Sequence, residues 1–174
     1  LAKVLAPEYR VLAMDLRGRG RSENPTNGYG LEYHLRDMNG LMDALGIDRA
    51  VVMGHSLGAF IGLAFAAQYP HRVDRLILVD GGGDLSKKQI DNVFQGIKPS
   101  LDRLTKVFPS AEAYLAAMKQ APYIQPWSAE IEGYYRYEIE STEGGVRTTI
   151  HTRHIAEEAE NIRKVKSAAL YSQV

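Results

Sequence analysis

The fold of this chain depends on the stretch Gly54-His55-Ser56-Leu57-Gly58, which joins two apolar segments. Residues 50–53 form a short apolar run, as in a buried strand, and residues 59–67 are long enough for a helix. A serine at such a strand-to-helix turn has the geometry of a nucleophile elbow, in which its oxygen stands clear of the backbone. The flanking glycines leave room where side chains would collide, and the start of the helix favours negative charge. We therefore predict an exposed nucleophile at Ser56; the alternative is a glycine-rich turn with an idle serine.

The composition is that of one globular α/β domain: 174 residues, of which 45% are hydrophobic and 24% charged. Lys and Arg together number 21, as do Asp and Glu, so no excess charge indicates nucleic acid or an anionic membrane as a partner. The absence of cysteine excludes disulfides and thiolate metal sites. The chain begins at Leu1 without a signal segment, and we expect an interior fragment of a cytoplasmic protein.

Strand and helix patterns alternate along the first half of the chain. Residues 10–14 and 75–80 are short apolar runs that predict two strands besides the one before Ser56. Residues 31–45 carry apolar side chains at i, i+3, i+4 and i+7 spacing, which predicts a helix with one buried face. Short links join these segments. The alternation is typical of a parallel sheet with helices on both faces.

An arginine- and glycine-rich segment follows the first predicted strand, and it reads Asp15-Leu16-Arg17-Gly18-Arg19-Gly20-Arg21-Ser22. Three arginines beside two glycines could bind an anion. The spacing is not G-x-G-x-x-G, however, and the segment does not open a helix. We favour a structural turn whose arginines pair locally, for instance with Asp15 or Glu23.

The alternation of strand and helix patterns ends at Asp84. Short helical segments broken by prolines follow, with Ser110 and Ser128 as expected N-caps. Residues 138–150 predict a hairpin and residues 152–165 a further helix. Six aromatic residues gather in this region: Tyr114, Tyr123, Trp127, Tyr134, Tyr135 and Tyr137. They either line a pocket or form the small core of a helical insertion.

These motifs together resemble the α/β-hydrolase superfamily, in its cap-bearing branch of small serine esterases and related enzymes. The resemblance rests on residues 10–22, 43–46, 54–58 and 76–81. It implies a partial doubly wound parallel sheet in which the three strands present are the family's fourth, fifth and sixth. It also implies three segments: a partial hydrolase core at 1–83, a mostly helical cap at 84–165, and a return toward the core at 166–174.

The family pattern places three strands before this segment and two after it, so the resemblance implies an interior piece of a longer hydrolase. The third family strand lies between the strand at 10–14 and the strand that enters the elbow. Without that strand, the unpaired backbone N–H and C=O groups and the apolar faces of its neighbours would be exposed to water. We therefore expect this chain alone to be poorly stable, and to aggregate or bind hydrophobic dyes.

Three residues form the expected catalytic set within this chain. Ser56 is the nucleophile, which needs a base to take its proton. The peptide N–H of Leu57 is one donor to the oxyanion that forms during acyl transfer. Asp80 is the in-chain candidate for the triad acid, because it ends the strand beside the elbow strand; some relatives place their acid there. The usual acid follows the family's seventh strand, outside this chain.

None of the five histidines is a clear base, and the family's histidine lies outside this chain. His55 sits on the elbow strand and points to the other face, as a packing or substrate-binding residue. For His34 we expect a solvent-facing role, and His71 follows a proline at a helix end. His151 and His154, which come after the cap segment, are the remaining alternatives.

The resemblance implies a serine hydrolase that cleaves a carboxylic ester or similar small acyl substrate through an acyl-enzyme. Alternatives on the same serine are C–C bond hydrolysis, lactone hydrolysis and perhydrolase chemistry; a non-catalytic ligand-binding member is a further alternative. Trp127 and Tyr134, with His55, are candidate substrate contacts. We expect no metal and no organic cofactor, and a small molecule as the partner rather than nucleic acid or a membrane. The oligomeric state stays open.

Overall fold

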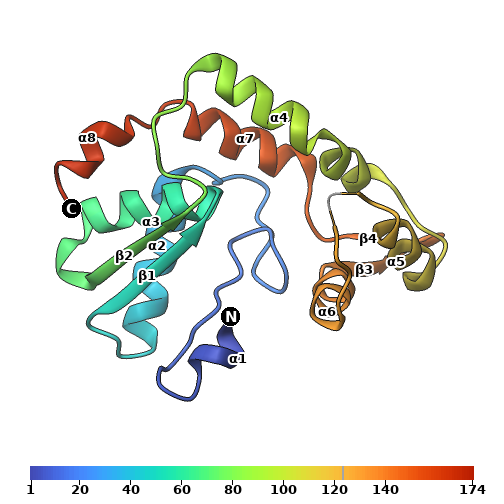
Figure 1. Ribbon diagram of the computed structural model, residues 1–174, viewed down its shortest axis with the longest axis horizontal. Helices are drawn as coiled ribbons and strands as arrows, with labels where there is room; N and C mark the ends of the chain where they lie inside the picture. Colours follow the sequence, from blue (N-terminus) through green and yellow to red (C-terminus); the bar gives the residue numbers. More distant parts are fainter. Residues whose placement is uncertain (123) are drawn as a thin grey trace. The chain divides into compact units, whose positions relative to one another are not determined.

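The computed structural model describes residues 1–122 and 124–174, so Tyr123 lies outside the described residues. The chain forms two compact units, which we describe separately (Figure 1). The elbow unit comprises Thr26–Lys106 and His151–Val174, and the hairpin unit comprises Leu1–Pro25 and Val107–Ile150. The sequence-based division at residues 83 and 165 groups the chain differently and stays a prediction.

A parallel pair of strands is the centre of the elbow unit. Strand β1 (Ala50–His55) pairs with β2 (Val73–Val79), with His55 opposite Val79 at their carboxyl ends. Helix α3 (Leu57–Gln68) makes the crossover between them and packs on one face of the sheet (Figure 1). This arrangement is the predicted α/β architecture.

The predicted strand at residues 10–14 is wrong. In the described part of the chain, β1 and β2 alone make up the parallel sheet, and residues 10–14 pair with no strand. An extended segment becomes a strand only when a neighbour satisfies its backbone N–H and C=O groups, and the described residues provide none for this segment. The parallel sheet thus has two of the three expected strands.

Helix α3 is buried almost all round. Every residue from Ala59 to Ala66 is buried, as the uniformly apolar sequence predicts. A β-carbon at Gly62 would lie 3.4 Å from the side chains of Leu76 and Val52, so the helix runs close to the sheet there. The helix ends at Gln68, before Pro70.

The other helices of the elbow unit surround this core. The predicted helix at 31–45 is confirmed as α2 (Leu31–Ala44). Helix α4 (Lys87–Asp102) begins at a capping box between Ser86 and Gln89, and Figure 1 shows it beside α7 (Thr152–Ile162). The remaining elements are α8 (Ser167–Tyr171) and the short 3₁₀ turns Pro70–Arg72 and Arg103–Thr105.

The hairpin unit contains the predicted hairpin and both predicted N-caps. Strands β3 (Ile139–Thr142) and β4 (Gly145–Thr148) pair antiparallel. The helices of this unit are α1 (Ala2–Leu5), α5 (Ala111–Lys119) and α6 (Ala129–Tyr137). The Ser110 hydroxyl accepts a hydrogen bond from the Ala113 N–H at the start of α5, and the Ser128 hydroxyl accepts one from the Ile131 N–H at the start of α6.

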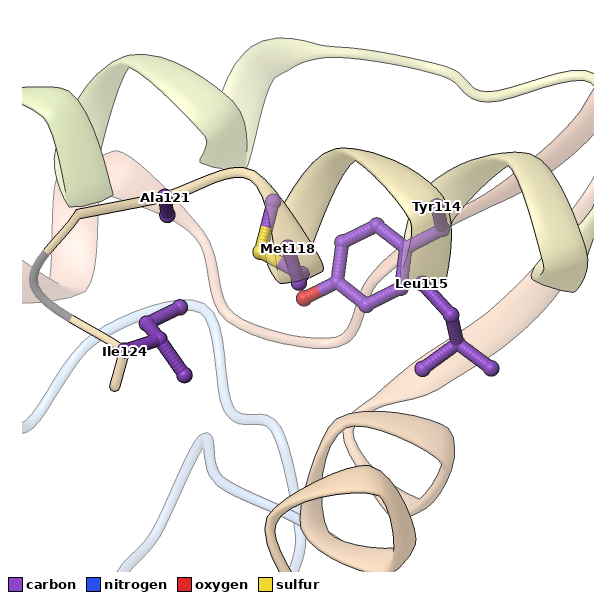
Figure 2. Close-up of a cluster of buried hydrophobic side chains, with 5 residues drawn as sticks. All are labelled: Tyr114, Leu115, Met118, Ala121 and Ile124. Atoms are coloured by element: carbon purple, nitrogen blue, oxygen red, sulfur yellow. The ribbon is translucent and has the colours of Figure 1, made fainter. Parts of the chain in front are cut away.

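The hairpin unit has a small core of its own. Figure 2 shows its five buried side chains, three from α5 and two from the segment after it: Tyr114, Leu115, Met118, Ala121 and Ile124. Trp127 and Tyr135 pack against this cluster, and their rings stack with centroids 5.8 Å apart. The packing supports the view that part of the aromatic cluster is structural.

Candidate active site

Ser56 occupies a strained turn between β1 and α3. Its backbone has φ 51° and ψ −116°, a left-handed region that residues other than glycine rarely adopt. The Ser56 N–H donates to the Val79 carbonyl at 3.0 Å, and the Ser56 carbonyl accepts from the Ala59 N–H at 2.9 Å. These two bonds fix the turn to the end of β2 and to the first turn of α3. The local geometry is that of the predicted nucleophile elbow.

Close backbone approaches explain two glycines around this turn. A β-carbon at Gly54 would lie 2.0 Å from the carbonyl oxygen of Gly58, and one at Gly81 would lie 2.6 Å from that of Ser56. A β-carbon at Gly58 meets nothing within 4 Å. The predicted collision is therefore confirmed at Gly54. At Gly58, a side chain would meet no neighbour. It is the backbone carbonyl of Gly58 that lies close to position 54.

The first N–H groups of α3 lie directly after Ser56. The hydrogen bonds of the helix begin with the Ala59 N–H, so the N–H groups of Leu57 and Gly58 precede the intrahelical ladder. Such N–H groups, together with the positive end of the helix dipole, favour a developing negative charge. The position of Leu57 therefore suits the predicted oxyanion donor.

Asp80 follows β2 at the same edge of the sheet. Its backbone is also left-handed, with φ 47°, and its side chain is 92% exposed. The His55 Nε2 lies 4.0 Å from the Asp80 Oδ2. Ligand and catalytic sites of open α/β sheets lie at the carboxyl ends of the strands. The structure thus brings Ser56, His55 and Asp80 to one edge.

The other histidines have different environments. His34 is buried, so the predicted solvent-facing role is wrong. Position 34 lies next to Leu35 and one turn before Met38, at the border of the apolar stripe, and this was the available signal. His154 is also buried and stacks on Tyr29, with ring centroids 3.8 Å apart.

Trp127 and Tyr134, the two predicted substrate contacts of the hairpin unit, differ in their surroundings. The Trp127 indole N–H donates to Glu132 at 3.4 Å, and the Lys119 ammonium lies 5.4 Å from the ring centroid. Tyr134 lines a cavity of about 190 Å³ together with Asp15, Tyr137 and other residues of this unit. Their role toward a substrate stays a prediction.

Local hydrogen bonds shift the pKa values of two side chains in the hairpin unit, Glu132 and Tyr137. Hydrogen bonds from Arg136, and then from Lys119 and Trp127, hold the pKa of Glu132 below its ordinary value. The Tyr137 hydroxyl donates to the Asp15 carboxylate, and this bond raises the pKa of Tyr137.

The arginine- and glycine-rich segment folds as a turn. The Asp15 carboxylate also accepts from the Arg21 N–H at 3.1 Å, and the Gly18 N–H donates to the Glu23 carbonyl at 2.8 Å. The Ser22 hydroxyl donates to the Asp15 carbonyl at 2.7 Å. These bonds support the structural-turn interpretation rather than an anion site.

The described residues show neither a metal-binding cluster nor a membrane-spanning helix. Within residues 1–122 and 124–174, no three His, Asp or Glu side chains are grouped so that they could hold a metal ion. Over the same residues, no helix combines the length and the apolar character that crossing a bilayer requires.

Comparisons with known proteins agree with this geometry. A family model described as alpha/beta hydrolase fold matches residues 1–138. An uncharacterised protein of Mycobacterium tuberculosis is 41% identical over 91 residues, which cover 52% of this chain and 26% of that protein. The 2-hydroxy-6-oxo-2,4-heptadienoate hydrolase of Pseudomonas putida is 37% identical over 106 residues, which cover 59% of this chain and 38% of that enzyme.

A solved structure shows the same fold over nearly the whole chain. The crystal structure of E-2-(acetamidomethylene)succinate hydrolase matches with a TM-score of 0.78 and 24% sequence identity. The match covers 92% of this chain and 57% of that one. This chain therefore spans 26% to 57% of the length of these three relatives.

Proposed function

The chain belongs to the alpha/beta hydrolase fold family, and we propose that it carries the nucleophile of a hydrolase that cleaves a small acyl substrate through an acyl-enzyme on Ser56. The observation that carries this proposal is the strained backbone of Ser56, with φ 51° in a non-glycine residue. Such strain is rare and is concentrated at functional sites. If Ser56 had no function, nothing would favour a serine over glycine in this strained conformation.

The proposed reaction begins when the Ser56 hydroxyl oxygen attacks the substrate carbonyl carbon while a base takes its proton. The Leu57 N–H donates to the oxygen that becomes negative in the tetrahedral intermediate. This intermediate collapses, the leaving group departs with the proton from the base, and an acyl-Ser56 ester remains. Water then attacks the ester with the help of the same base, which releases the acid and restores Ser56.

We assign to Asp80 the role of the acid that orients the base. Its carboxylate is exposed at the carboxyl edge of β2, beside the strand that leads into Ser56. A carboxylate there can hold the base histidine in the tautomer that accepts the serine proton. The base itself is not assigned to a histidine of this chain.

Cleavage of a C–C bond is the second candidate reaction. The 37% identity to a 2-hydroxy-6-oxo-2,4-heptadienoate hydrolase favours it. The same serine would attack a ketone carbonyl, and the leaving carbon would need a proton. Ester and C–C cleavage therefore share Ser56 and Leu57 but differ in the group that protonates the leaving atom. A ligand-binding member without activity is the third outcome.

The test uses the full-length protein that contains this chain. An active-site fluorophosphonate probe should label Ser56, as located by peptide mass spectrometry. Ser56→Ala should lower hydrolysis roughly 10³-fold or more while the fold is kept. Ser172→Ala is the matched control, because Ser172 is exposed and its hydroxyl donates to the Ala169 carbonyl at 2.8 Å.

A nitrophenyl ester and a 2-hydroxy-6-oxo acid, assayed side by side, distinguish the two reactions. Turnover of the ester alone supports acyl hydrolysis, and turnover of the dienoic acid alone supports C–C cleavage. Full activity in Ser56→Ala would contradict the proposed nucleophile. Absence of both labelling and turnover would support the ligand-binding alternative instead.

A further inference from the structure

A cavity of about 290 Å³ lies between α4 and α7, the two helices that Figure 1 shows side by side. Five of the side chains that line it are apolar: Phe94, Leu101, Ile155, Ala156 and Ala159. The other two lining residues, Thr152 and Arg163, lie at opposite ends of α7. Ser56, Leu57 and Asp80 do not belong to this lining, so the proposed reaction leaves the cavity unexplained.

The part of the lining that α7 provides is one stripe along the helix. Its residues follow one another at spacings of three or four, which places them on a single face: Thr152, Ile155, Ala156, Ala159 and Arg163. A rise of about 1.5 Å per residue puts about 16 Å between the two ends of this stripe. The cavity is therefore long and narrow, with an apolar middle.

The one charged residue in this lining is Arg163, which directly follows α7. Its guanidinium lies over the Phe94 ring, 5.2 Å from the ring centroid. Its Nη1 lies 4.0 Å from the Glu160 Oε2, whereas the Lys164 Nζ lies 3.2 Å from the other oxygen of the same carboxylate. A guanidinium has five N–H donors, and stacking on a ring leaves those at its edge free to bind a carboxylate.

The acidic residues of α4 have cationic partners on their own helix. The Lys87 Nζ lies 3.2 Å from the Asp91 Oδ2, and the Lys98 Nζ lies 2.7 Å from the Asp102 Oδ1. The lining itself contains no carboxylate. The chemistry of the cavity is thus that of an apolar channel with one positive end.

We propose that this cavity is a binding site for a medium-chain fatty acid, with the carboxylate on Arg163 and the alkyl chain directed along α7 toward Thr152. Hydrogen bonds between a guanidinium and a carboxylate are charge-assisted and can be bidentate. The alkyl chain removes the apolar walls from water, including Leu101 and Ile155. With C–C bonds of about 1.5 Å, a chain of about ten carbons fits the length of about 16 Å.

The lining also distinguishes this ligand from related molecules. A dicarboxylate of the same length would bring its second charge to the end at Thr152, where the lining has a hydroxyl group and no cation. An alkyl ammonium would place its charge beside Arg163 or in the apolar middle. An alcohol would fill the channel but would lose the charge-assisted bonds. The order of affinity should therefore be monocarboxylate first, then alcohol, with dicarboxylate and ammonium last.

Calorimetric titration of the full-length protein with decanoate tests the site. The Ser56→Ala protein is used, so that the result does not depend on the proposed hydrolase activity. Decanoate should bind at least about tenfold more tightly than 1-decanol, decanedioate and decylammonium. Loss of fluorophosphonate labelling in the wild-type protein would contradict the proposed function and would leave this titration unaffected.

Two variants locate the ligand within the protein. Arg163→Gln should weaken decanoate binding about tenfold or more and leave 1-decanol unchanged. Lys166→Gln is the control, because it removes the same charge from an exposed residue three positions later that does not line the cavity. Ala156→Phe should block both ligands by filling the channel, and it should fold because Ala156 is exposed. Thermal melts check the folding of each variant.

The titrations decide the proposal for every outcome. Equal affinity for decanoate and 1-decanol, or full decanoate affinity in a folded Arg163→Gln protein, would overturn the role of Arg163. Decanoate binding that a folded Ala156→Phe protein retains would place the ligand outside this cavity. A wild-type chain context that binds no decanoate would overturn the site altogether, whether or not a variant folds.

Discussion

Gly54 lies so close to the carbonyl of Gly58 that a β-carbon at position 54 would be 2.0 Å from that oxygen. The backbone at the carboxyl end of β1 therefore contacts the backbone of the first turn of α3. This contact holds the strand and the helix at the angle that places Ser56 in its strained conformation. The elbow depends on the absence of one side chain as much as on the presence of the serine.

The first prediction concerns this contact. Gly54→Ala should lower the free energy of unfolding by about 3 kcal/mol or more, because backbone atoms on both sides must move to admit the methyl group. Urea unfolding of the full-length protein measures the loss. In any folded fraction, the fluorophosphonate reactivity of Ser56 should fall as well, since the turn no longer presents the hydroxyl in the same way.

Gly58→Ala is the matched control for this prediction. A β-carbon at position 58 meets nothing within 4 Å, and the residue lies in the first turn of α3. Alanine there should change the free energy of unfolding by no more than about 1 kcal/mol, with a gain in helix propensity. Equal losses for the two substitutions would show that the close approach does not set the elbow.

Local sequence patterns predicted the elbow unit well. The apolar run before Ser56, the all-apolar α3 and the alternation with β2 each have a cause within a few residues, so they are readable without the structure. The hairpin at β3 and β4 has a local cause as well, in Glu143-Gly144-Gly145. Where short-range geometry decides the conformation, the prediction holds.

The failures depend on partners distant in sequence. Residues 10–14 have the composition of a strand, but pairing requires a neighbour that composition does not reveal. His34 was expected in solvent because its partner, Glu158, lies on a helix more than a hundred residues later. The acid and the base stay predictions for a related reason, since a catalytic set is brought together by the fold and not by sequence spacing.

The second prediction concerns Asp80 as the orienting acid. Asp80→Asn in the full-length protein should lower kcat roughly 10³-fold or more with little change in stability, since its side chain is exposed. Asp74→Asn is the control, because Asp74 is also exposed and lies near the opposite end of β2. Steady-state kinetics and thermal melts separate the two effects. A kcat that Asp80→Asn leaves intact would place the acid elsewhere in the protein.

The third prediction follows from the hydrogen bond that Tyr137 donates to Asp15, which raises the pKa of Tyr137. A folded-state pKa above the unfolded one stabilises the protein fully below the unfolded value, and this contribution is lost as the pH rises through the folded value. The advantage in Tm of wild type over Tyr137→Phe should therefore be constant up to about pH 10 and shrink above it.

Tyr9→Phe is the control for that comparison, because Tyr9 is an exposed tyrosine of the same unit. Its Tm difference from wild type should not change in the same alkaline range. An advantage over Tyr137→Phe that grows with pH would have the wrong sign, and it would show that the Tyr137 hydroxyl does not act through its bond to Asp15.

The fourth prediction concerns the face of the sheet that α3 does not cover. Val51 and Met53 of β1 and Ile77 and Val79 of β2 are exposed there, at 48%, 49%, 44% and 36%. A contiguous apolar patch of this kind binds hydrophobic dyes and promotes association. This chain, expressed by itself, should therefore enhance the fluorescence of anilinonaphthalene sulfonate, and the pair Val51→Thr and Ile77→Thr should reduce the enhancement roughly twofold. Threonine keeps the β-branched shape, so the strands should persist.

Val107→Thr is the control, since Val107 is 50% exposed but lies in the hairpin unit. A monomeric chain that melts cooperatively and binds no dye would contradict this prediction, because the face would then be covered in solution.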